Sequence, residues 1–180
     1  MSTHRWFVAA AAALVLSSAV YAVQQAARPG VVGAVTSLAV DTETGGKVEI
    51  KYSTLPFGPK TFENVKANPD LAARWEQMLP RMLGAKFHSD AALKFGDKDV
   101  AAGDYDVSFT LTGEAGIQLK LLPKEGEAIV LPMRANTGAP ATKFLNLNLM
   151  STGGGEFALA VGYGSEQLVI DGKVAPKSGG

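Results

Sequence analysis

The sequence contains no cysteine, only two histidines, and no excess of charge of either sign. Without cysteine it can form neither a disulfide framework nor a thiolate metal site, so burial and hydrogen bonds must stabilise the fold. The 17 basic and 17 acidic residues cancel, which argues against nucleic-acid binding because that function needs a basic face. The chain has 180 residues, 47% of them hydrophobic and 19% charged, and is long enough for one domain with a core.

The first 22 residues have the composition of a secretory signal peptide. His4 and Arg5 form a polar start, residues 6–16 are apolar, and small residues occupy 17–22. We expect cleavage between Ala22 and Val23, then a linker over 23–34, and a mature protein in the periplasm or outside the cell without stable membrane insertion. The alternative is an uncleaved anchor, because the apolar run 6–23 approaches the roughly 20 residues that span a bilayer.

Two runs near the centre of the chain, 87–95 and 105–112, alternate between apolar and polar side chains with the period of a half-buried strand. Glycines between the runs suit a turn or bulge. The sequence therefore predicts a central antiparallel hairpin with one dry face. The side chains expected on that face are Phe87, Ser89, Ala91, Leu93, Phe95, Tyr105, Val107, Phe109 and Leu111.

One helix is expected after residue 68. Asn68 can cap its first turn, Pro69 suits the first helical position and Asp70 complements the helix dipole. Pro80 should stop or kink the helix, and Gly84 should close the segment. An apolar stripe at helical spacing predicts core contacts, so that the helix forms a lid on the sheets. The stripe consists of Leu71, Trp75, Met78, Leu79 and Met82.

Short alternating segments punctuated by turn residues fill the rest of the chain. They lie at 48–52, 117–121, 128–134, 145–149, 157–163 and 168–170, with an irregular loop at 53–60. Pro132 marks an edge or a bulge within its strand. This pattern predicts a mainly β fold, an antiparallel, jelly-roll-like β-sandwich over residues 35–170 with one inserted helix and a disordered tail at 171–180.

Several phrases resemble domain-of-unknown-function family 2911, a group of exported bacterial domains. They are Ile50-Lys-Tyr-Ser53, Gly58-Pro-Lys-Thr-Phe62, Leu93-Lys-Phe-Gly96, Val100-Ala-Ala-Gly-Asp-Tyr105 and Val130-Leu-Pro-Met133. The resemblance implies a β-sandwich in the periplasm or outside the cell and no established activity. Members carry an arginine where this chain has Pro59, and different residues around 75–76 and 84–87, so no site residue is carried over.

Catalytic chemistry has few candidate residues. The predicted mature chain has one histidine, His88, and no Gly-x-Ser-x-Gly elbow, so a serine triad could only use His88 with Asp90 or a remote acid. We interpret His88 as a surface histidine and predict no catalytic residue, no metal and no cofactor. Aspartates crowd the central turn, but they lack the order and closing glutamate of an EF-hand, so we interpret them as turn residues. They are Asp97, Asp99, Asp104 and Asp106.

Uncharged polar side chains on the outward strand positions could stand near one another and bind a sugar or peptide; the alternative is an ordinary solvated face. The candidate ligand-binding residues are His88, Ser108, Thr110, Gln118, Lys120, Asn146 and Asn148.

The function that follows is an exported, non-catalytic β-sandwich that binds a small molecule, a glycan or a protein partner in the cell envelope. That polar face or an exposed sheet edge would make the contact. A second hypothesis is a periplasmic hydrolase or isomerase that uses His88 with a nearby carboxylate. A third is a homo-oligomer formed by edge pairing.

Overall fold

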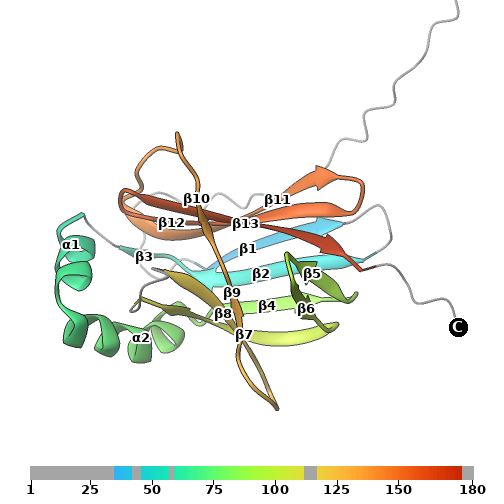
Figure 1. Cartoon of the computed structure of the whole chain (residues 1–180), viewed down its shortest axis with the longest axis horizontal. Helices are drawn as coiled ribbons and strands as arrows, with labels where there is room; N and C mark the ends of the chain where they lie inside the picture. Colours follow the sequence, from blue (N-terminus) through green and yellow to red (C-terminus); the bar gives the residue numbers. More distant parts are fainter. Residues whose placement is uncertain (1–34, 42–45, 57–58, 112–116, 176–180) are drawn as a thin grey trace, which may run out of the picture.

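The two antiparallel sheets form two layers (Figure 1), and apolar side chains on alternate strand positions line the space between them, which confirms the predicted β-sandwich. The computed structural model describes residues 35–41, 46–56, 59–111 and 117–175. The predicted signal peptide with its Ala22–Val23 cleavage site, the linker 23–34 and the end of the tail lie outside the described residues.

The six-stranded sheet has the order β1-β2-β4-β7-β8-β9, and the seven-stranded sheet has the order β3-β11-β12-β13-β5-β6, with β10 also paired to β13. The strands of the first sheet are β1 (Val35–Asp41), β2 (Lys47–Ser53), β4 (Lys86–Ser89), β7 (Gly103–Thr110), β8 (Gln118–Pro123) and β9 (Ile129–Leu131). Those of the second are β3 (Leu55–Pro56), β5 (Leu93–Phe95), β6 (Lys98–Val100), β10 (Arg134–Ala135), β11 (Phe144–Gly153), β12 (Glu156–Tyr163) and β13 (Glu166–Val174).

Aromatic rings join the two sheets across the core. The Phe87 ring of β4 lies 6.3 Å from both the Tyr105 ring of β7 and the Phe95 ring of β5. Phe95 in turn meets Phe157 of β12 edge to face, with ring centroids 5.5 Å apart. Tyr52 adds a buried polar link, since its hydroxyl donates a hydrogen bond of 3.0 Å to the Leu147 carbonyl of β11. These contacts make the two layers one core.

The predicted strand 87–95 is divided between the two sheets, which corrects the expected hairpin. Its first half, β4, pairs with β7 through Phe87↔Tyr105, whereas its second half, β5, pairs with β13 and β6. Ser89 Oγ donates to the Ala91 carbonyl at 2.7 Å, and the Asp90 N–H bonds to the Lys47 carbonyl, so the chain bends after Ser89. The bend preserves the alternation, which is why the sequence pattern did not reveal it.

Helix α2 (Pro69–Leu83) begins as predicted. The Asn68 side chain accepts the Leu71 N–H at 3.1 Å, and Gly84, at φ +51°, ends the helix. The sequence predicted that the helix stops or kinks at Pro80. The helix does not stop there, since it runs three residues further and buries Leu83 completely.

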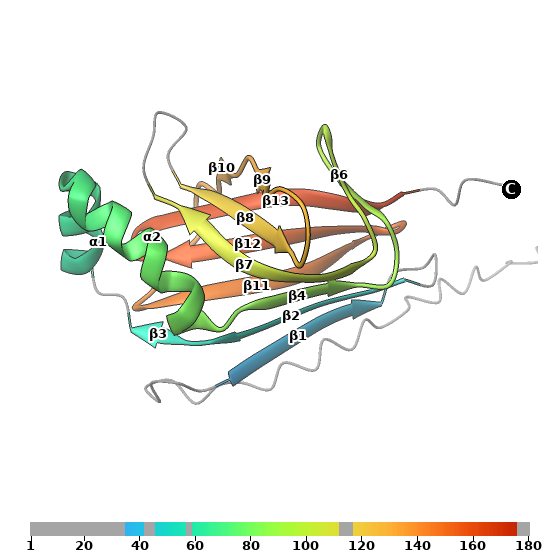
Figure 2. The same cartoon turned by 90° about the horizontal axis from the view of Figure 1, so that it is seen from below.

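A second helix, α1 (Pro59–Ala67), begins inside the segment expected to be an irregular loop, and it stands with α2 at one end of the sandwich (Figures 1 and 2). Within the described ranges no helix is long and apolar enough to cross a membrane. Helix α2 packs against β7 and β2. Of its apolar stripe, Leu79 is fully buried, but Met78 and Met82 are 44% and 42% exposed, so their placement in the core is wrong. The stripe is wider than the surface that α2 covers.

Two boundaries near the C-terminus also differ. The expected strand 128–134 divides at Pro132 into β9 in one sheet and β10 in the other, so the proline interrupts the strand as its missing N–H predicts. Strand β13 continues to Val174, four residues beyond the predicted end of the domain at Ile170, because Gly172 and Val174 still pair with β12 and β5.

Candidate functional site

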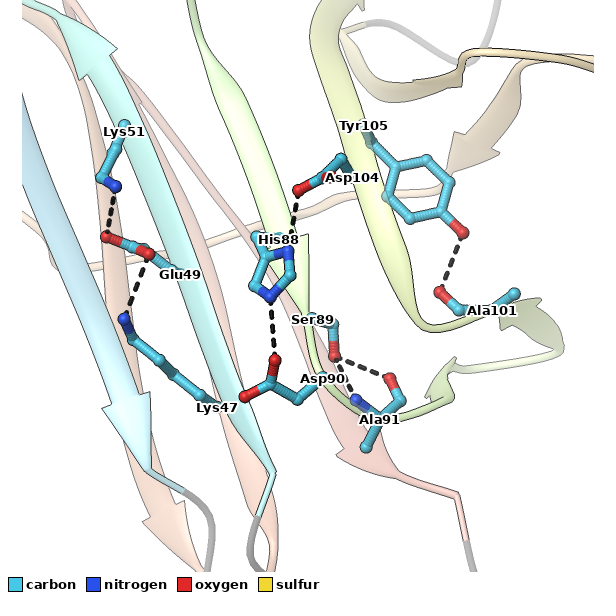
Figure 3. A network of polar contacts seen from close by, with 10 residues as sticks. All are labelled: Lys47, Glu49, Lys51, His88, Ser89, Asp90, Ala91, Ala101, Asp104 and Tyr105. Carbon is cyan, nitrogen blue, oxygen red and sulfur yellow. Dashed lines mark hydrogen bonds and ion pairs between the residues drawn. The ribbon is translucent and has the colours of Figure 1, made fainter.

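His88 stands between two carboxylates on the outer face of the six-stranded sheet (Figure 3). It points outward because its neighbours Phe87 and Ser89 point into the core. Strand register places Asp104 of β7 directly opposite, 2.8 Å from Nδ1, and the bend after Ser89 brings Asp90 to 2.9 Å from Nε2. We call His88, Asp90 and Asp104 the His88 cluster.

This geometry favours the imidazolium form, because both ring nitrogens can then donate to a carboxylate. The hydrogen bond to Asp90 and then that to Asp104 raise the pKa of His88 above its ordinary value. The same contact with His88 lowers the pKa of Asp90. The His88 side chain is 39% exposed, so water screens these interactions.

Glu49 lies next to His88 in the strand register but is held by other partners. It accepts from Lys51 at 3.0 Å, from Lys47 at 3.2 Å and from the Ser37 hydroxyl at 2.9 Å. The hydrogen bond from Lys51 is the largest cause that lowers the pKa of Glu49, to about 2. Glu49 is therefore an anion neutralised by lysine.

The remaining polar groups near the cluster are engaged in local structure. Ser89 is 1% exposed, and its hydroxyl faces inward to the Ala91 backbone. The Tyr105 hydroxyl donates to the Ala101 carbonyl at 2.8 Å. On the next row outward, Lys86 forms an ion pair with Asp106. His88 thus has orienting carboxylates on both sides, and within the described ranges no hydroxyl nucleophile is bonded to it, an arrangement that suits a structural ion-pair row.

Metal binding needs several ligands that converge on one point. In the part of the chain that the structure describes, no group of three or more histidine, aspartate or glutamate side chains is placed to hold an ion. The central aspartates are used otherwise: Asp99 pairs with Lys94 at 3.1 Å and Asp97 with Lys98 at 3.6 Å.

The other predicted ligand-binding residues do not form one face. Ser108 pairs with Lys120 and Thr110 with Gln118 in the six-stranded sheet, so these four do come together. Ser108 and Gln118 are, however, only 5% and 8% exposed. Asn146 and Asn148 lie on β11 of the other sheet, opposite Gly162 and Ala160. The prediction that these residues share a single polar face is therefore wrong. The periodicity of a strand shows which of its side chains face outward, but not which sheet the strand joins.

Sequence reasoning placed Asp90 beside His88 but missed Asp104, Glu49 and the lysines. Outward charges at alternate positions of β2 were visible in the sequence. What was missing was the register that sets Glu49, His88 and Asp104 in one row across β2, β4 and β7. That register depends on the segment between β4 and β7, which crosses to the other sheet and forms β5 and β6 there. No local feature of the sequence indicated this crossing.

No protein-family model matches the chain, and neither a curated protein nor a solved structure matches it significantly. The resemblance to domain-of-unknown-function family 2911 therefore stays a prediction, and function has to be argued from the geometry.

Proposed function

We propose that this protein is an exported, non-catalytic β-sandwich domain that binds a protein partner in the cell envelope. The observation that carries the non-catalytic part is the occupation of both ring nitrogens of His88, by Asp104 at 2.8 Å and Asp90 at 2.9 Å. A general base must offer a free nitrogen to the proton that it removes. His88 serves instead to tie β4, β7 and the bend after Ser89 together. The N-terminal segment, read as a signal peptide, supplies the route of export.

The rival hypothesis, a hydrolase or isomerase, has one observation in its favour. A carboxylate bonded to Nδ1, as Asp104 is, is the usual orienting partner of a catalytic imidazole. Such a mechanism would need Nε2 to face the substrate, and Asp90 occupies that direction. Asp90 would have to swing away before catalysis.

Strand β1 is the best surface for a protein partner. It is seven residues long, pairs with β2 in continuous register, and forms one edge of the six-stranded sheet. It contains neither proline nor lysine, the residues that commonly block further pairing at an edge. The opposite edge, β9, has three residues and ends before Pro132. An extended segment of a partner, or of a second copy, would add to β1 by backbone hydrogen bonds.

Two experiments test this function. Wild type, His88→Ala and Asp90→Asn are assayed on ester, phosphate and glycoside substrates; we expect no turnover by any of them, and turnover that is lost in His88→Ala would refute the proposal. A photoreactive residue at Ala39 of β1 should give a cross-linked adduct in cells, whereas one at Lys51 of the neighbouring central strand should not. Equal adducts from both positions would rule out recognition at the edge, and an adduct of doubled mass would identify the partner as a second copy.

A further inference from the structure

The end of the sandwich that carries the two helices exposes apolar side chains. The large hydrophobic residues that are exposed in the described part of the chain are Val35, Met78, Met82, Val130 and Met150. Met78 and Met82 belong to α2, and Val35 begins β1 opposite Ser53, the residue from which the chain leads through β3 into α1. Three of the five thus lie at the helix-bearing end, where β1 starts in both views (Figures 1 and 2).

Helix α2 combines these methionines with cations. Arg74, Met78, Arg81 and Met82 follow one another at spacings of four, three and one residues, which puts them on one side of a helix. The buried residues Ala72, Leu79 and Leu83 occupy the opposite side. Both arginines are exposed, and neither has an ion-pair partner among the residues that the structure describes. We call Arg74, Met78, Arg81 and Met82 the α2 outer face.

We propose that the α2 outer face docks on an anionic lipid bilayer. The interface of such a bilayer offers phosphate groups to the two guanidinium groups and, immediately beneath, an apolar layer for the two thioether side chains. A second copy of the chain fits less well, because a two-fold contact would bring Arg74 and Arg81 of both copies together. An acidic soluble protein would pair with the arginines but needs no exposed methionines.

The connection of the chain supports a bilayer as the occupant. The apolar run 6–23 is joined to β1 by residues 24–34, which reach at most about 40 Å even when fully extended. While that run is in a membrane, during export or as an anchor, the start of β1 therefore lies within about 40 Å of the bilayer. The docked orientation does not use the edge of β1, so it stands apart from the proposed partner binding.

Fluorescence of Trp75 can report docking without interference from the N-terminal segment. The sequence has two tryptophans, so Trp6→Phe in the full chain leaves Trp75, one turn from Met78 and two turns from Met82, as the only tryptophan. The protein is mixed with vesicles of brominated phosphatidylcholine, with and without phosphatidylglycerol, because bromine quenches tryptophan at short range. We expect quenching of Trp75 in the anionic vesicles and little in the neutral ones, even where the N-terminal segment inserts into both.

Variants separate the contribution of the arginines to docking from that of the methionines. Arg74→Gln with Arg81→Gln should weaken the anionic-vesicle affinity roughly fivefold per charge, about 25-fold in all, and salt should weaken the wild type likewise. Met78→Gln with Met82→Gln keeps helix propensity but should abolish quenching. The matched controls are Met150→Gln, at a methionine of similar exposure (45%) on β11, and Lys124→Gln in the turn between β8 and β9.

Circular dichroism melts confirm that each variant is folded. Absence of Trp75 quenching in anionic vesicles would overturn the proposal, as would control variants that lose as much quenching as the α2 variants. Self-association that depends on Met78 and Met82, without quenching, would assign the α2 outer face to a second copy instead. Binding of an acidic protein that the arginine variants abolish, again without quenching, would assign it to that protein.

Discussion

The strongest test of the His88 cluster is its response to pH. As an imidazolium, His88 donates to Asp90 and Asp104 together; as a neutral ring it has one N–H and can donate to only one of them. The carboxylates therefore raise the pKa of His88 above its ordinary value of 6.5. A raised folded-state pKa means that this contribution to stability is complete below pH 6.5 and is lost as the pH rises through the folded-state pKa.

The size of the contribution follows from exposure. The side chains of His88 and Asp104 are 39% and 69% exposed, so the pair is close to the surface case, in which an ion pair contributes about 0.2–1 kcal/mol. His88→Gln should therefore lower the free energy of unfolding by less than about 1 kcal/mol near pH 5, and by less still near pH 8. Urea unfolding of the wild type and of His88→Gln at the two pH values measures the difference in the free energy of unfolding. Groups that titrate alike in the two proteins cancel in that difference.

Nuclear magnetic resonance gives the pKa directly, since the chain has only His4 and His88 to assign. Asp90→Asn and Asp104→Asn should each lower the pKa of His88, and Asp90→Asn should lower it more because that hydrogen bond is the largest cause of the shift. Glu49→Gln is the control: Glu49 is adjacent but bonded to lysines, so it should have a smaller effect. A His88 pKa at or below 6.5, or one that neither aspartate variant changes, would refute the cluster.

Three further predictions concern the core and the helix. Gly172→Ala would put a Cβ 2.5 Å from Cζ of the Phe157 ring, so urea unfolding should show a loss of roughly 1–3 kcal/mol; an unchanged midpoint would contradict the packing. Tyr52→Phe leaves the buried Leu147 carbonyl without its 3.0 Å donor and should cost about 1–3 kcal/mol with an unaltered circular dichroism spectrum. Asn68→Ala removes the cap of α2 and should cost about 1 kcal/mol in thermal unfolding, whereas Asn68→Asp, which caps equally well, should not.

The sequence pattern predicted the class of the fold because alternation is a local property. Residues such as Val48 and Ile50 on β2, and Val107 and Phe109 on β7, are buried as the period of two requires. Assignment of a strand to a sheet is not local. The chain crosses from one sheet to the other after Ser89, and both halves keep the same side chains inward, so the alternation continues unbroken through the crossing.

The same limit explains the candidate site. The sequence predicted that His88 and Asn146 share one polar face, but His88 meets Asp104, which was interpreted as a turn residue, and Asn146 lies in the other sheet. Contact between His88 and Asp104 depends on the pairing of β4 with β7, and thirteen residues of bend, hairpin and turn (90–102) separate those strands. A hairpin with a short loop would have fixed that register by its turn type alone. A loop with its own hairpin leaves the register undetermined until the sheets are assembled.

Met78 and Met82 were predicted to lie in the core but are exposed, and this difference bears on function. Helical spacing grouped Met78 and Met82 with Leu79, and only Leu79 reached the core. A surface helix needs an apolar stripe only as wide as the area that it covers. The part of the stripe beyond that area adds little to stability, so Met78→Gln with Met82→Gln should leave the melting temperature of the domain nearly unchanged. If those side chains are kept for contact with a bilayer, the double variant should lose vesicle docking without losing stability, whereas a large drop in stability would mean that the methionines serve the fold.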